Sequence, residues 1–89
     1  MKAVITVTGT DSKGIIAKVS GACFEHGANI IDISQSVLKE YFAMIMLVDI
    51  DDLNIGFNAF IDSMTELGNK NGLQIHTMHE DIFNTMHKI

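Results

Sequence analysis

Hydrophobic residues follow two different periods along the chain, and each change of period marks a new element. Residues 3–7 (AVITV) form a short β-branched run that is typical of a buried strand. From residue 15 the apolar positions recur at helical spacing, at Ile15, Val19, Ala22, Cys23 and His26. Gly27 follows the last of these positions and predicts a left-handed stop, so we expect a helix over 15–26.

The next segment predicts a hairpin of two strands. Residues 29–37 alternate between apolar and polar side chains, as in a half-buried strand with a polar second face. The apolar set is Ile31, Ile33 and Val37, and the polar set is Asp32, Ser34 and Ser36. A short polar connection leads to residues 41–50, a second apolar strand. The turn between them contains no Asn-Gly or Gly-Gly pair, so its type stays open.

A second helical period follows this hairpin. Phe57, Phe60, Ile61, Met64 and Leu67 fall on one helical face. Polar residues precede this run, and we expect Asn54 or Asp52 to be the N-cap. The stretch 69–72 (NKNG) predicts the end of the helix.

The last two segments complete the order of elements. Residues 73–79 predict a fourth strand, and residues 80–89 predict a short amphipathic helix that packs on the body. Right-handed crossovers place two strand–helix–strand halves in one antiparallel sheet with both helices on one face. We therefore expect the α+β class, a ferredoxin-like βαββαβ sandwich plus a short C-terminal helix, forming one domain over 1–89.

The amino-acid composition limits the kinds of partner that this chain is expected to bind. All six basic residues are lysines, against eleven Asp and Glu, and the formal net charge is −5. An acidic chain without arginine is a poor nucleic-acid binder. No apolar run approaches the roughly 18–20 residues that cross a membrane. A single cysteine, Cys23, excludes an internal disulfide. We expect a cytoplasmic protein with no nucleic-acid or membrane partner.

The loop from Gly9 to Ile15, between the first strand and the first helix, is the strongest candidate site. Backbone N–H groups at a helix start lack partners within the helix and face a partial positive charge, so they bind carboxylates or phosphates. Gly9 and Gly14 allow close approach of a ligand or a positive φ. Two interpretations stay open: a ligand site, or a plain turn in which Asp11 or Ser12 caps the helix.

Residues 9–35 carry a family resemblance. They contain Gly-x-Asp-x-x-Gly-Ile, then a helix that ends in glycine, then Asn-Ile-x-Asp-x-Ser-Gln. The matching residues are Gly9, Asp11, Gly14, Ile15, Gly27, Asn29, Ile30, Asp32, Ser34 and Gln35. The chain resembles an ACT domain, a small regulatory module that senses amino acids in metabolic enzymes, and it is most similar to small stand-alone ACT proteins related to the glycine-cleavage repressor.

The resemblance also implies a site. Effectors of ACT domains lie between the first loop and the start of the second strand, commonly across a dimer interface. In this chain that selects Gly9 to Ile15, with Lys13 as a positive charge on a mobile stem, together with Asn29 and Ile30. His26 precedes the helix stop, where residues of some ACT domains touch the ligand. The amide of Asn29 suits an amino acid, because it can accept from the ammonium group and donate to the carboxylate.

Other side chains predict little further chemistry. His76 and His79 are three apart in a predicted strand and therefore point to opposite faces. No Cys pair or acidic–His cluster has ligand spacing, so we expect no metal and no cofactor. No Ser-His-Asp or Cys-His pairing can be argued, and we expect no enzyme activity. Cys23, on the apolar helix face, is expected to be a buried packing group.

Two functions of different classes follow. The first is a homodimeric regulatory domain that binds a small-molecule effector, an amino acid, and acts on a protein partner or pathway. The alternative is a constitutive dimerisation or adaptor module that binds a protein and no small molecule. A response of the protein to amino acids, and its loss in Asn29→Ala, distinguishes the two.

Overall fold

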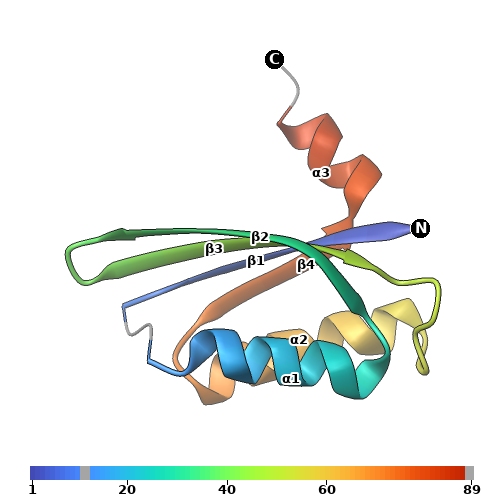
Figure 1. Ribbon diagram of the computed structural model, residues 1–89, viewed down its shortest axis with the longest axis horizontal. Coiled ribbons are helices and arrows are strands. Elements are labelled where there is room, and N and C mark those ends of the chain that lie inside the picture. Colours follow the sequence, from blue (N-terminus) through green and yellow to red (C-terminus); the bar gives the residue numbers. More distant parts are fainter. Residues whose placement is uncertain (11–12, 88–89) are drawn as a thin grey trace.

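The computed structural model describes residues 1–10 and 13–87, and its elements follow the predicted order (Figure 1). The strands are β1 (Lys2–Gly9), β2 (Asn29–Leu38), β3 (Tyr41–Asp49) and β4 (Gln74–His79). The helices are α1 (Ile15–His26), α2 (Phe57–Lys70) and α3 (Glu80–Met86). The βαββαβ order with a third helix confirms the ferredoxin-like fold class.

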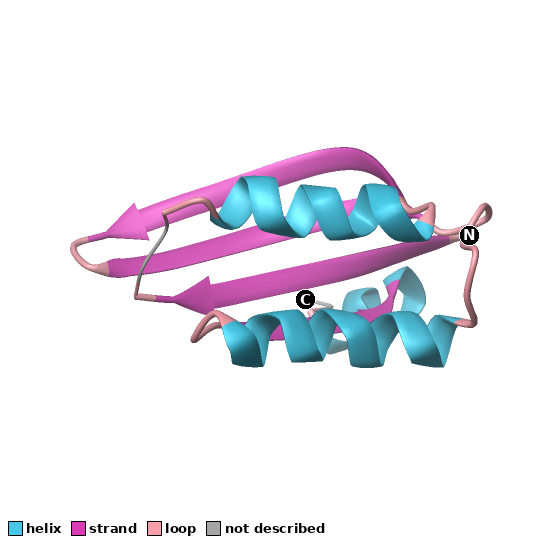
Figure 2. Ribbon diagram, turned by 90° about the horizontal axis from the view of Figure 1, so that it is seen from below, coloured by secondary structure: helices cyan, strands magenta, loops and turns pink. Residues whose placement is uncertain are grey.

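The four strands form one antiparallel sheet in the order β2-β3-β1-β4. Helices α1 and α2 lie side by side on one face of this sheet (Figure 2). The central strands β1 and β3 bury alternate side chains against the helices. The core residues that they and the helices share are Ala3, Ile5, Val7, Phe42, Met44, Met46, Val48, Val19, Cys23, Phe60 and Met64. Strands β2 and β4 remain as the edges of the sheet.

Gly27 ends α1, as predicted. Its φ is 80°, and its N–H donates to the carbonyl of Phe24 at 3.2 Å, while the N–H of Ala28 donates to Cys23 at 2.8 Å. This pair of hydrogen bonds is a Schellman motif, which satisfies carbonyls that the helix leaves unpaired. A Cβ at position 27 would overlap the carbonyl oxygen of Asp52, so only glycine fits here.

Asn54 also serves the end of α1. The prediction that Asn54 or Asp52 caps α2 is wrong, because the N-cap of α2 is Gly56. The Asn54 side-chain amide instead donates to the carbonyl of Glu25 at 2.8 Å, and its backbone N–H donates to the carbonyl of His26 at 3.0 Å. The loop before α2 therefore satisfies the carbonyl end of α1.

Strand β2 is far more exposed than predicted. Only Ile33 is partly buried, since β2 is an edge strand at the margin of the helix layer. The pairing with β3 also shifts register between Ile30 and Asp32, which makes Ile31 the extra residue of a bulge. As a result Ile30, and not Ile31, shares the helix-covered face with Ile33 and Val37.

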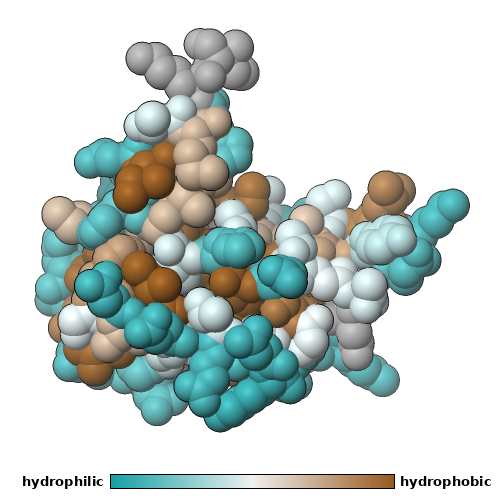
Figure 3. Space-filling view, turned by 180° about the vertical axis from the view of Figure 1, so that it is seen from behind, coloured by the Kyte–Doolittle hydropathy of each residue, from teal (hydrophilic) through white to brown (hydrophobic). Residues whose placement is uncertain are grey.

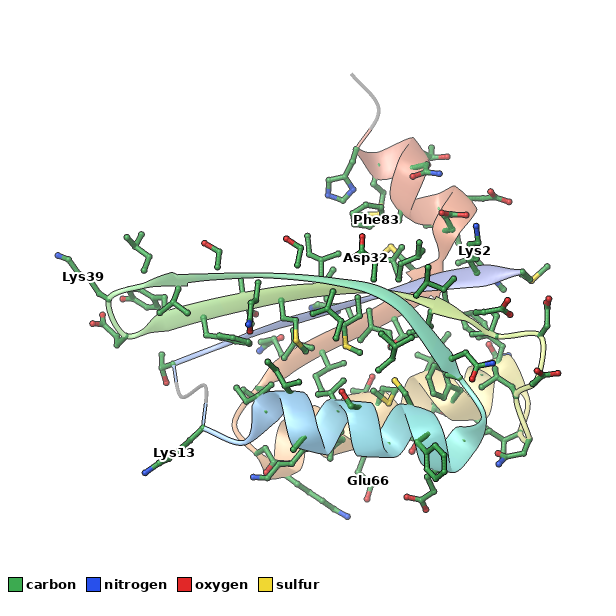
Figure 4. All side chains as sticks on the ribbon, in the orientation of Figure 1. Lys2, Lys13, Asp32, Lys39, Glu66 and Phe83 are labelled. Atoms are coloured by element: carbon green, nitrogen blue, oxygen red, sulfur yellow. The ribbon has the colours of Figure 1, made fainter. Side chains whose placement is uncertain are left out.

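Helix α3 packs less closely than expected. It follows β4 directly and rises from the sheet face opposite α1 and α2 (Figure 1). None of its residues is buried, and Phe83 points back toward the sheet (Figure 4). Ile82 and Met86 are 52% and 65% exposed, and hydrophobic surface is visible on this helix in Figure 3.

Gly21 within α1 and Gly27 at its C-cap give a matched test of the helix. Gly27→Ala should lower the free energy of unfolding by about 1–3 kcal/mol, because alanine is strained at φ 80° and its Cβ would meet Asp52. Gly21→Ala should raise it by up to about 1 kcal/mol, since Gly21 is an exposed mid-helix glycine and an added Cβ meets no described atom within 4 Å. Urea denaturation measures both changes, and effects of the same sign would contradict this account.

The role of Asn54 can be tested with one substitution at two sites. Asn54→Asp should lower the free energy of unfolding by about 1–2 kcal/mol, because it removes a donor and places a negative charge at the carbonyl end of α1. Asn58→Asp, an exposed site in the first turn of α2, should be neutral or slightly stabilising. Thermal denaturation should show a fall of about 5–10 °C for the first variant only. Equal melting temperatures would show that Asn54 does not act on α1.

Candidate functional site

The loop 9–15 joins β1 to α1 at one end of the sheet (Figure 1). Gly14 is the N-cap of α1, with φ 71°, and the N–H of Lys18 donates to its carbonyl at 3.0 Å. Gly14 has no side chain with which to cap the first turn, and that turn contains no acidic residue. The predicted site residues Asp11 and Ser12 lie outside the described residues. The start of α1 thus presents the amide end of the helix to this loop.

Three other predicted loop residues differ in what they offer. Ile15 is 3% exposed and belongs to the core, so only its backbone can meet a ligand. Gly9 packs closely on Leu73, since a Cβ there would lie 2.5 Å from Cδ2 of Leu73 and that side chain would have to shift. Lys13 is exposed and points outward at the end of the molecule where Lys39 also lies (Figure 4).

The remaining predicted site residues lie at or beyond the other end of α1. His26 is half-buried, with its Nε2 3.1 Å from Oγ of Ser63 and its ring edge-on to Phe60 at 6.0 Å between centroids. It therefore links α1 to α2. Asn29 and Ile30 begin β2, and both are exposed.

The two halves of the predicted site are far apart within one chain. Helix α1 has 12 residues, so its ends are about 18 Å apart at 1.5 Å per residue. The sheet register agrees, because Gly9 pairs with Phe42 and Asn29 pairs with Asp49, seven residues further along β3, or about 23 Å. One small molecule cannot touch both the loop and Asn29 of the same chain.

The other reactive side chains are separated as well. His76 pairs with Thr6 on the uncovered face, whereas His79 stacks on Phe57 of α2 at 4.1 Å, so the two point to opposite faces as predicted. Within residues 1–10 and 13–87, no three His, Cys, Asp or Glu side chains are placed to hold a metal. Cys23 is fully buried, and burial raises the pKa of its thiol to about 11, which keeps it protonated at neutral pH.

One hollow at the loop end of the sheet was not anticipated from the sequence. A pocket of about 420 Å³ is lined by residues of all four strands, including Thr8, Ser36, Ala43 and Gln74. The signal for it was a small residue, Ala43, within an otherwise large apolar strand.

Known proteins resemble this chain over most or all of its length. The profile of the ACT domain family matches residues 2–78. The chain belongs to the ACT domain family. This ACT domain is 47% identical to a UPF0237 protein of Clostridium perfringens over 89 residues, which cover 100% of both chains. It is 42% identical to the solved ACT domain protein from Streptococcus pneumoniae, with a TM-score of 0.82 and 93% of each chain covered.

A further solved structure adds a regulatory relative. It is assigned as a glycine cleavage system transcriptional repressor and is 26% identical to this ACT domain, with a TM-score of 0.69 over 85% of this chain and 43% of that one. The resemblance to stand-alone ACT proteins related to this repressor is thereby confirmed. In the described part of the chain, no helix of this ACT domain has the length and apolar character needed to span a bilayer.

Proposed function

We propose that this ACT domain is a cytoplasmic regulatory sensor without catalytic activity. It works as a homodimer in which an amino acid binds between two chains and favours one arrangement of the pair, which a protein partner reads. The observation that carries the proposal is the separation of the two halves of the site, about 18 Å within one chain. A second chain supplies the missing half.

Strand β2 provides the means of joining the halves. Within the described chain it pairs on one side only, and a long free edge is a template for pairing with another copy. Antiparallel pairing of two β2 strands about a twofold axis places Asn29 of one chain beside Leu38 of the other. The Leu38 end is the loop end, since Val37 pairs with Phe42 and Phe42 with Gly9. Asn29 of each chain then lies at the same end of the sheet as the loop of its partner.

The flank of α1 extends this surface. Lys18 donates to Asn71 at 2.9 Å and His26 contacts Ser63, so the side of α1 that carries them faces α2. The opposite flank, at i, i+4 and i+8, carries Ile16, Ser20 and Phe24. Helix α1 lies on the β2 side of the helix layer (Figure 2), so this flank continues from the free edge of the sheet. Phe24 is 87% exposed, which is unusual for a large apolar side chain.

The two halves offer complementary chemistry to a zwitterion. The amide end of α1 favours a carboxylate, and the positive charge of Lys13 lies at the same end of the molecule. The Asn29 side chain can accept from an ammonium group. The solved relative assigned as a transcriptional repressor supports a regulatory role for this type of ACT protein.

A thermal-shift screen against the twenty amino acids tests the proposal. A ligand at about a hundredfold its dissociation constant adds about 2.7 kcal/mol of stability. For a domain of this size that is a rise of roughly ten degrees or more in Tm. We expect at least one amino acid to give such a shift, and Asn29→Ala to abolish it, because the exposed amide is a ligand group with no core contact. The Tm of the free variant should stay within about 4 °C of the parent.

The loop half of the site needs its own matched pair, Gly14→Asp and Gly14→Asn. Both side chains tolerate positive φ better than most and can cap a helix, so both variants should fold. Only Asp places a carboxylate where the effector's carboxylate is expected, and it should abolish the shift while Asn retains it. A protein that forms dimers but responds to no amino acid at millimolar concentration would contradict the sensor and favour the adaptor module.

A further inference from the structure

One row of side chains crosses the sheet on the face that α1 and α2 leave uncovered. Ser36 pairs with Ala43, Ala43 pairs with Thr8, and Thr8 pairs with Gln74, so each strand contributes one residue at the same register. All four line the pocket of about 420 Å³. That volume lies within the range of about 300–1,000 Å³ typical of small-molecule sites.

The hollow results from the small residue in the middle of this row. The next row on the same face has Ile45 at the corresponding position of β3, paired with Ser34 and Thr6. Ala43 lacks the three carbon atoms that Ile45 adds beyond Cβ, so the sheet surface is lower at Ala43. The small side chain of Ala43 therefore accounts for the depression in the sheet surface.

The β2–β3 hairpin forms one wall of the pocket. Leu38 and Tyr41 pair across the hairpin, both line the pocket, and both are exposed. The two-residue connection between them includes Lys39 at φ 56°, a left-handed conformation that costs a non-glycine residue energy. The Lys39 side chain points outward from the end of the sheet (Figure 4). The turn therefore presents Leu38 and Tyr41 to the pocket and keeps the Lys39 charge outside it.

The chemistry of the lining selects a class of ligand. None of the described residues that line the pocket is charged, so these residues offer a ligand charge no charged partner. Tyr41 offers a flat aromatic face and Leu38 an aliphatic contact, which together suit a planar ring. Gln74 offers a donor and an acceptor side by side, and Thr8 and Ser36 add hydroxyl groups. A planar ring with an amide-like edge satisfies all of these groups.

We propose that this pocket binds an uncharged planar heterocycle that carries a donor–acceptor edge, as a nucleobase or a nicotinamide ring does. The ring lies over Ala43 against Tyr41, and its polar edge meets Gln74 and the hydroxyl groups of the row. The pocket opens on the uncovered sheet face and does not include Asn29, but its lining includes Gly9, Thr10 and Leu38, so it adjoins the loop half of the proposed amino-acid site.

Nicotinamide and nicotinate provide matched probes, because they share a ring and differ in an amide against a carboxylate. Titration of the ¹⁵N-labelled protein should move the backbone amide signals of Thr8, Ser36 and Gln74 with nicotinamide, and also with adenine. Nicotinate should bind about tenfold or more weakly, since its charge finds no partner in the lining. If neither nicotinamide nor adenine binds at a concentration of about 10 mM, the proposal is overturned.

Variants assign the binding to the pocket. Ala43→Trp fills the hollow and should abolish nicotinamide binding, whereas Ile45→Trp, one row away on the same strand and face, should leave it unchanged. Gln74→Leu, at an exposed strand position, should weaken binding about threefold or more without altering the fold. Unchanged binding in both Ala43→Trp and Gln74→Leu would also overturn the proposal. Asn29 does not line the pocket, so Asn29→Ala should remove the amino-acid response and leave this titration unchanged, and the two proposals can therefore fail independently.

Discussion

The burial of one face of α1 against the sheet is the constraint on which the rest of the structure depends. Ile15, Val19 and Cys23 anchor the helix along its whole length, so it must run back from the end of β1 to the start of β2. That direction places its amide end and its carbonyl end at opposite ends of the sheet. The Gly9–Ile15 loop and Asn29 are separated for the same reason. Under the proposed function, a single chain therefore carries two half-sites and no whole one.

The two ends of α1 differ in how their unpaired backbone groups are satisfied. The carbonyl end is closed from within the chain, by the Schellman turn at Gly27 and by Asn54. The amide end begins at Gly14, which has no side chain to offer. Among the described residues, no side chain caps the amide end, and an uncapped amide end can bind an anion. The asymmetry is why the loop, and not the Gly27 turn, is the better candidate for binding.

Much of the fold could be predicted from local pattern, and the errors have a common cause. The bounds of α1 follow from the spacing of its apolar residues and from Gly27, both of which are local signals. The role of Asn54 was missed because its partner carbonyl on Glu25 is 29 positions away. The exposure of β2 was missed because alternation does not distinguish an edge strand from a central one. For the site, the sequence identified residue types, but the row that contains Ala43 exists only once the register of four strands is known.

The central claim is that each amino-acid site combines the loop of one chain with Asn29 of another. The most direct measurement mixes equal amounts of Gly14→Asp and Asn29→Ala chains, lets the dimers reassort, and counts binding sites by calorimetry with the effector that stabilises the parent protein. Each variant alone should bind nothing. Random pairing makes about half of the dimers mixed, each with one intact site, so the mixture should recover about a quarter of the parent's sites. If the mixture recovers no binding, although mixed dimers form, the site does not span two chains.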